Sequence, residues 1–167
     1  MQVARLAVLI LASTASVFAQ SEAKILITGD IPTPVTITAA DIAAMPRESI
    51  ELTDPETADH EGGKFKYEGV SLQEVLKKAG IPFGSGIRGK WLASYILASA
   101  KDGYQVVYSL GELDSSFGNE RVLIVDKRDG KPLFAYQGPL RLVVAGDKAG
   151  ARDVRMLEKI EVVRLRK

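Results

Sequence analysis

The stretch with the clearest chemical content lies near the C-terminus, where positively charged side chains surround a glycine-bearing loop. Residues 138–155 read GPLRLVVAGDKAGARDVR, and Arg141, Lys148, Arg152 and Arg155 supply the charge. Backbone N–H groups of a glycine loop combined with guanidinium groups suit a bound phosphate or carboxylate. We therefore predict that these four residues bind an anionic ligand or cofactor, with solvated bases as the alternative.

Metal and nucleophile chemistry has few candidates. The chain has no cysteine and one histidine, which excludes thiolate nucleophiles, thiolate metal ligands and zinc sites made of cysteines or several histidines. His60 lies among Asp54, Glu56, Asp59 and Glu61. A metal site and a solvated loop both fit this cluster, and the absence of ligand spacing on a fixed element favours the loop. We predict no catalytic residue and no metal ligand.

The elements that would position these residues are mostly strands. Alternating or apolar runs predict strands over residues 24–28, 35–37, 49–53, 64–68, 91–99, 104–109, 121–126, 140–144 and 160–165. Asp-Gly pairs at 102–103 and 129–130 predict hairpin turns, and residues 111–118 predict a turn with a short helical piece. Gly84, Gly86 and Gly89 have dinucleotide-motif spacing, but they follow a predicted helix and lead toward a strand, so we interpret them as a loop.

Two short helices are expected between the strands. Thr38 predicts the cap of a helix over residues 39–45, and Ser71 with Glu74 predicts a capping box on a second helix that ends at Gly80. No long alternation of strands and helices is present. The order therefore predicts an α+β fold with mixed, mostly antiparallel sheets and a few short helices.

The N-terminus has the features of an export signal. Arg5 precedes an apolar run at residues 6–12, which is too short to cross a bilayer, and Val17 and Ala19 form a signal-peptidase site. We predict a signal peptide over residues 1–19, one domain over residues 20–167, and a periplasmic or secreted location. An uncleaved anchor or a buried first helix is the alternative. The mature chain carries 21 bases and 21 acids, which predicts no nucleic-acid partner and no stable membrane insertion.

Several runs together resemble a known family in their order and spacing. These are TAADIAAMP at 38–46, YEGVSLQEVL at 67–76, KDGYQVVYS at 101–109, VLIVDKRDGKPL at 122–133, GPLRLVV at 138–144 and RDVRMLEKIEV at 152–162. The sequence resembles the oxidoreductase molybdopterin-binding domain, which has the sulfite oxidase fold, and most closely its short exported members. The resemblance implies a mixed α/β fold of mostly antiparallel sheets.

The departures from the family pattern bear on function. In catalytic members a cysteine thiolate ligates molybdenum, and the matching stretch here, residues 52–60, has no cysteine. Thr53, Asp54 and Thr57 are the hydroxyl and carboxylate groups that could replace it. The family's Gly-x-Lys-x-x-Lys run near the pterin phosphate is matched by residues 150–155, where Arg152 and Arg155 replace both lysines.

Two functions follow from these observations. The first is a non-catalytic binding module with no cofactor, whose partner is an anionic small molecule or another exported protein. The second is a molybdopterin-dependent oxidoreductase with an atypical metal ligand. Loss of the soft thiolate favours the first.

Overall fold

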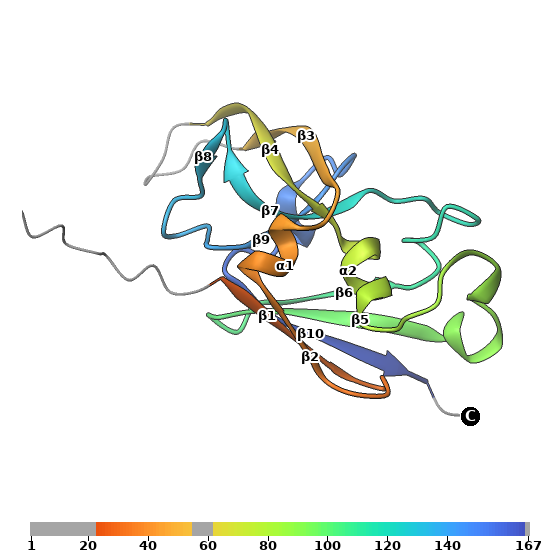
Figure 1. Cartoon of the computed structure of the whole chain (residues 1–167). Coiled ribbons are helices and arrows are strands. Elements are labelled where there is room, and N and C mark those ends of the chain that lie inside the picture. Colours follow the sequence, from red (N-terminus) through yellow and green to blue (C-terminus); the bar gives the residue numbers. More distant parts are fainter. Residues whose placement is uncertain (1–22, 55–61, 166–167) are drawn as a thin grey trace, which may run out of the picture.

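Two five-stranded sheets form the body of the protein. The computed structural model describes residues 23–54 and 62–165. The first sheet has the order β2-β1-β10-β5-β6 and contains β1 (Lys24–Gly29), β2 (Val35–Thr38), β10 (Leu157–Arg164), β5 (Ser94–Ala100) and β6 (Gln105–Ser109). Only β1 and β10 pair in parallel in this sheet. The sheet occupies the lower half of Figure 1.

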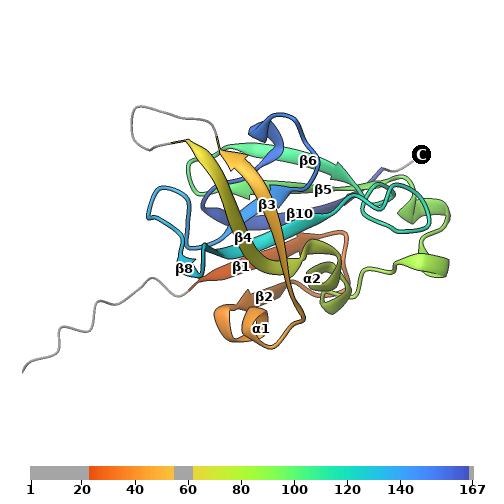
Figure 2. The same ribbon diagram turned by 90° about the horizontal axis from the view of Figure 1, so that it is seen from above.

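The second sheet carries the residues of most interest. It is built from β3 (Arg47–Asp54), β4 (Gly63–Ser71), β7 (Val122–Arg128), β8 (Lys131–Pro132) and β9 (Arg141–Val144). Its path is β3-β4-β7-β8, and β9 also pairs with β7. All of its pairs are antiparallel. Figure 2 shows β3 and β4 crossing over the strands of the first sheet. The predicted α+β fold with mostly antiparallel sheets is confirmed.

The main core lies between the two sheets. Strand β7 begins with a continuous apolar run because both of its faces are buried there. Val122 and Ile124 pack into the main core, whereas Leu123 and Val125 pack into a smaller cluster on the opposite face. A strand that is covered on both faces has no solvent-facing positions, so its sequence does not alternate. Each fully buried aliphatic side chain contributes roughly 1.5–3 kcal/mol to this packing.

The first helix forms as its sequence predicts. In α1 (Ala39–Ala43), Thr38 caps the N-terminus and forms a capping box with Asp41. The helix ends at Ala43 rather than at residue 45, and β3 begins at Arg47, directly after Pro46.

The second helix differs from its prediction at one end. In α2 (Leu72–Lys78), Ser71 occupies the cap position without a side-chain hydrogen bond, so the predicted capping box with Glu74 is wrong. Glu74 instead accepts a hydrogen bond from Lys77 at 2.7 Å. At the other end Gly80 terminates the helix as predicted: it has a φ of 85°, and the N–H groups of Gly80 and Ile81 close back on Lys77 and Leu76. Both helices flank the space between the sheets (Figures 1 and 2).

Some loop segments differ from the structure predicted for them. Trp91, predicted to start a strand, belongs to the short 3-10 helix η2 (Gly89–Trp91), and β5 begins only at Ser94. Another such turn, η1 (Gly84–Gly86), occupies the glycine loop. Residues 111–118 form turns without the predicted helical piece, whereas both predicted hairpins are present. In the described part of the chain, no helix is long and apolar enough to span a bilayer.

Candidate functional site

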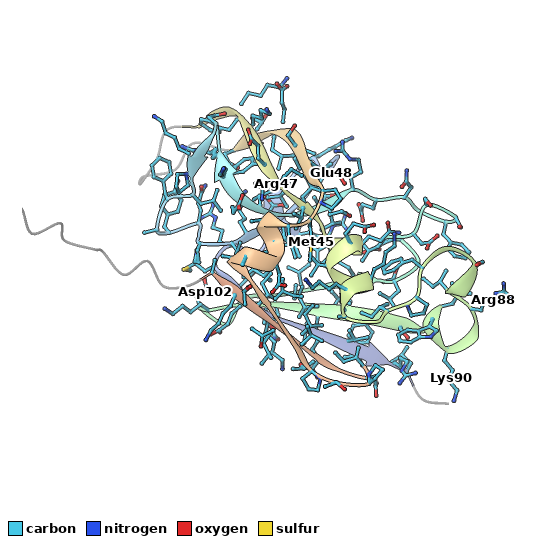
Figure 3. The ribbon with its side chains drawn as sticks, in the orientation of Figure 1. Met45, Arg47, Glu48, Arg88, Lys90 and Asp102 are labelled. Carbon is cyan, nitrogen blue, oxygen red and sulfur yellow. The ribbon has the colours of Figure 1, made fainter. Side chains whose placement is uncertain are left out.

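A cleft of about 850 Å³ opens where the end of β3 faces the β5–β6 hairpin and the segment after β9. Asp102, at the tip of that hairpin, is labelled in Figure 3. The short 3-10 helix η3 (Gly150–Arg152) follows β9 and forms part of the wall. The lining residues are Glu51, Leu52, Thr53, Asp54, Ala100, Asp102, Tyr104, Arg141, Val144, Gly146, Asp147, Lys148, Gly150, Ala151, Asp153 and Arg155. Three of the four predicted ligand-binding bases therefore line one cleft.

A buried ion network forms the floor of this cleft. The Arg141 side chain is 3% exposed, and its Nη2 lies 3.1 Å from Asp54 Oδ1 and 2.6 Å from Asp153 Oδ2. Its Nη1 donates to the Tyr67 hydroxyl at 2.8 Å and to Asp54 Oδ2 at 3.3 Å. Tyr67 in turn donates to Asp54. The charge of Arg141 is thus neutralised by two carboxylates inside the protein.

The surroundings of the residues in this network shift their pKa values. Burial raises the pKa of Asp54, but hydrogen bonds from Arg141 and Tyr67 outweigh burial and hold the pKa below its usual value. Burial and the Asp54 hydrogen bond raise the pKa of Tyr67 to about 12. Burial also raises the pKa of Asp153, against the attraction of Arg141. At neutral pH, Arg141 remains charged and Tyr67 remains protonated.

Arg128 completes this region from the side of β7. Its guanidinium contacts two aromatic rings, 4.0 Å from the Phe65 centroid and 4.6 Å from the Phe134 centroid. One of its nitrogens approaches Asp54 to 3.8 Å. Stacking on aromatic faces holds a guanidinium in place while its charge still reaches the carboxylate. Asp54 therefore lies near two guanidinium groups.

Arg152, the fourth predicted base, is engaged by carboxylates beside the cleft. It is absent from the cleft lining, and its guanidinium contacts Asp147 at 2.6 Å and Glu120 at 2.5 Å. Glu112 lies 3.8 Å away. The Tyr108 hydroxyl donates to the Arg152 carbonyl. Arg152 therefore ties the segment after β9 to the turns before β7, and neighbouring carboxylates neutralise it.

Lys148 and Arg155 are the two bases that present charge to the cleft. Both side chains are exposed, and neither forms an ion pair with another described residue. The Arg155 guanidinium lies 5.8 Å from the centroid of the Tyr136 ring. The same cleft is also lined by Glu51, which pairs with Lys64 at 3.3 Å, and by Asp102. The two bases therefore act in a cleft of mixed charge.

Sequence reasoning missed the partners of Arg141, although one signal was available. Arg141 is the charged residue in an otherwise apolar run, LRLVV, predicted to be a strand. A charge in a buried strand requires a buried counter-charge. The sequence could not identify that partner, because Asp54 lies 87 positions away and Asp153 lies 12 positions away.

The alternative metal ligands can be judged from their surroundings. Thr53 and Asp54 line the cleft, but both Asp54 oxygens accept hydrogen bonds from Arg141. Thr57 and His60 lie outside the described residues. Among the residues that are described, no three His, Cys, Asp or Glu side chains come together to hold a metal ion. With no thiol in the chain and Asp54 engaged by arginine, this donor set does not fit a molybdenum centre with its usual protein ligand.

Comparison with known proteins identifies the family of this cleft-bearing fold. No curated protein matches the chain. A chain of the crystal structure of the sulfane dehydrogenase SoxCD from Paracoccus pantotrophus has the same fold, with a TM-score of 0.63 and 18% identity. The similarity covers 84% of the present chain but only 38% of that chain. The sequence pattern of the oxidoreductase molybdopterin-binding domain matches residues 13–167. The predicted resemblance is confirmed, and the chain belongs to the oxidoreductase molybdopterin-binding domain family.

Proposed function

We propose that this protein is an exported, non-catalytic binding module of its family, which holds an anionic small molecule in the cleft between β3 and the segment after β9. The Arg141–Asp54 pair carries this proposal. In the stretch that matches the family's metal-binding segment, Asp54 turns both carboxylate oxygens toward a guanidinium at 3.1 and 3.3 Å. A carboxylate held in this way is a structural ion-pair partner and has little capacity left to ligate a metal.

The ligand is anionic because the cations with available charge are Lys148 and Arg155. Arg141 shapes the cleft floor and Arg152 fixes one of its walls, so neither needs to contact the ligand. An exposed ion pair contributes only about 0–1 kcal/mol, so two bases alone give weak binding. Backbone N–H groups around Gly146 and Gly150 would add donors for a phosphate or carboxylate. The acids Glu51 and Asp102 would disfavour highly charged polyanions.

Thermal stabilisation by anions tests the cleft. We expect inorganic phosphate and a pterin phosphate to raise the melting temperature of the mature protein, and the double variant K148A/R155A to lose that increase. The control K127A/K131A removes the same charge from the exposed β7–β8 hairpin and should retain it. Equal stabilisation in all three proteins would show that the anion acts through general charge screening, which would overturn the cleft assignment.

The competing function is a molybdopterin-dependent oxidoreductase with an oxygen ligand to the metal. Family membership favours it, and Thr53 is the cleft residue that could supply a hydroxyl. Metal analysis separates the two functions. The gene is expressed with its N-terminal segment in a host that makes molybdopterin, and the purified protein is analysed for molybdenum, tungsten and oxidised pterin. We expect none at stoichiometric level, whereas about one molybdenum per chain together with a pterin would establish the oxidoreductase.

A further inference from the structure

A second hollow, of about 880 Å³, lies at the other end of the first sheet, where β10 ends beside η2. Its walls are formed by Asp30, Gly89, Lys90, Leu92, Ala93, Arg164 and Leu165. Figure 3 shows Lys90 pointing away from the ribbon at this end of the molecule, close to the end of β10. None of these residues lines the cleft described above, so the hollow is a separate feature.

The walls of this hollow expose apolar groups to solvent. Leu92 is 48% exposed and Leu165 is 62% exposed, and both belong to the lining. Exposed leucines are common singly, whereas two large apolar side chains around one concavity offer continuous apolar surface to a ligand. Covering them removes apolar surface from water, which favours a ligand with an apolar body.

Two cations, Lys90 and Arg164, stand beside this apolar surface, and the hollow also contains one acid, Asp30. The Arg164 guanidinium lies 4.9 Å from the centroid of the Trp91 ring, and within the described chain neither Arg164 nor Lys90 forms an ion pair. Most arginines near the cleft are instead neutralised, as Arg141 and Arg152 are. The acid of the hollow, Asp30, accepts the backbone N–H of Arg164 at 2.9 Å.

We propose that this hollow binds a small amphiphile with an anionic head and an apolar body, of the class of medium-chain carboxylates. The head would lie against Lys90 and the Arg164 guanidinium, which lies over the Trp91 ring and can present paired N–H donors to a carboxylate. The body would cover Leu92, Ala93 and Leu165. This site does not depend on the function proposed for the first cleft.

The single tryptophan of the chain provides a direct measurement. Trp91 is the only tryptophan, and its ring centroid lies 4.9 Å from the Arg164 guanidinium, so a ligand at the hollow should change its fluorescence. We expect octanoate to produce a saturable change and octylammonium, with the same chain and the opposite charge, to produce none. N-acetyl-leucine, which imitates the apolar C-terminus of a peptide, is titrated in parallel to distinguish a peptide source from a free fatty acid.

Variants assign the binding to individual groups. We expect K90Q/R164Q to weaken octanoate binding by about tenfold or more, because charge-assisted hydrogen bonds are lost, and L92S to weaken it through lost apolar contact. The controls are K127Q and L26S, since Lys127 and Leu26 are exposed residues outside the hollow. Isothermal titration calorimetry repeats each measurement without relying on Trp91. Absence of octanoate binding, equal binding of octylammonium, or unchanged binding in K90Q/R164Q would overturn the proposal.

Discussion

Replacing Arg141 by methionine tests whether the floor of the cleft is a buried ion network that the fold depends on. The substitution keeps a long side chain but leaves Asp54 and Asp153, whose side chains are 5% and 8% exposed, without the guanidinium between them. Removing one partner of a buried pair costs about 3–5 kcal/mol. Arg128 remains 3.8 Å from Asp54, so we expect a value near the lower limit. For a domain of this size each kcal/mol lowers the melting temperature by roughly 2–4 °C.

Urea denaturation of the wild type, R141M and R121M measures this cost. Arg121 pairs with Glu48 at 3.1 Å, but the two side chains are 51% and 40% exposed, so its loss should cost only about 0–1 kcal/mol. A second arm varies the pH. Without Arg141, burial raises the folded-state pKa of both carboxyls above the unfolded value near 3.9. The variant then loses stability as the pH rises from the unfolded-state pKa to the raised folded-state pKa. The difference in unfolding free energy between the wild type and R141M should therefore shrink on acidification. If R141M loses no more stability than R121M at pH 7, the network is not structurally important.

Three further predictions concern other parts of the chain. G69A should be strongly destabilising, because a Cβ at Gly69 would lie 2.0 Å from the Ile124 carbonyl oxygen where β4 meets β7; G111A, with nothing within 4 Å, is the matched control in the same denaturation experiment. Y67F removes the hydroxyl between Arg141 and Asp54 and should cost about 1–3 kcal/mol; a stability within error of the wild type would contradict the hydrogen-bond assignment. Exported protein should begin at Gln20 or within a residue or two, and an intact mass that retains residues 1–19 would refute cleavage.

The sequence by itself determined the class of fold and the family. Alternating and apolar runs located the strands, because a sheet with one buried face imposes a period of two residues. The Asp-Gly pairs located both hairpins, and Gly80 located the end of α2, because these residues readily adopt the positive φ that such positions need. Each of these signals is local, so no knowledge of distant residues was required. The predicted capping box at Ser71 does not form, and Glu74 accepts a hydrogen bond from Lys77 instead.

Only the tertiary structure decided which bases remain available for a ligand. In the sequence, Arg141, Lys148, Arg152 and Arg155 are equivalent positive charges. The pairing of β4 with β3 and β7, and of β7 with β9, brings Arg141 to Asp54 across 87 positions. The turns before β7 bring Glu120 to Arg152 across 32 positions. Electrostatic interactions depend on distance in space and on burial, neither of which a local pattern encodes. Arg141 and Arg152 are therefore neutralised by neighbouring carboxylates. Lys148 and Arg155 alone of the four remain exposed at the cleft.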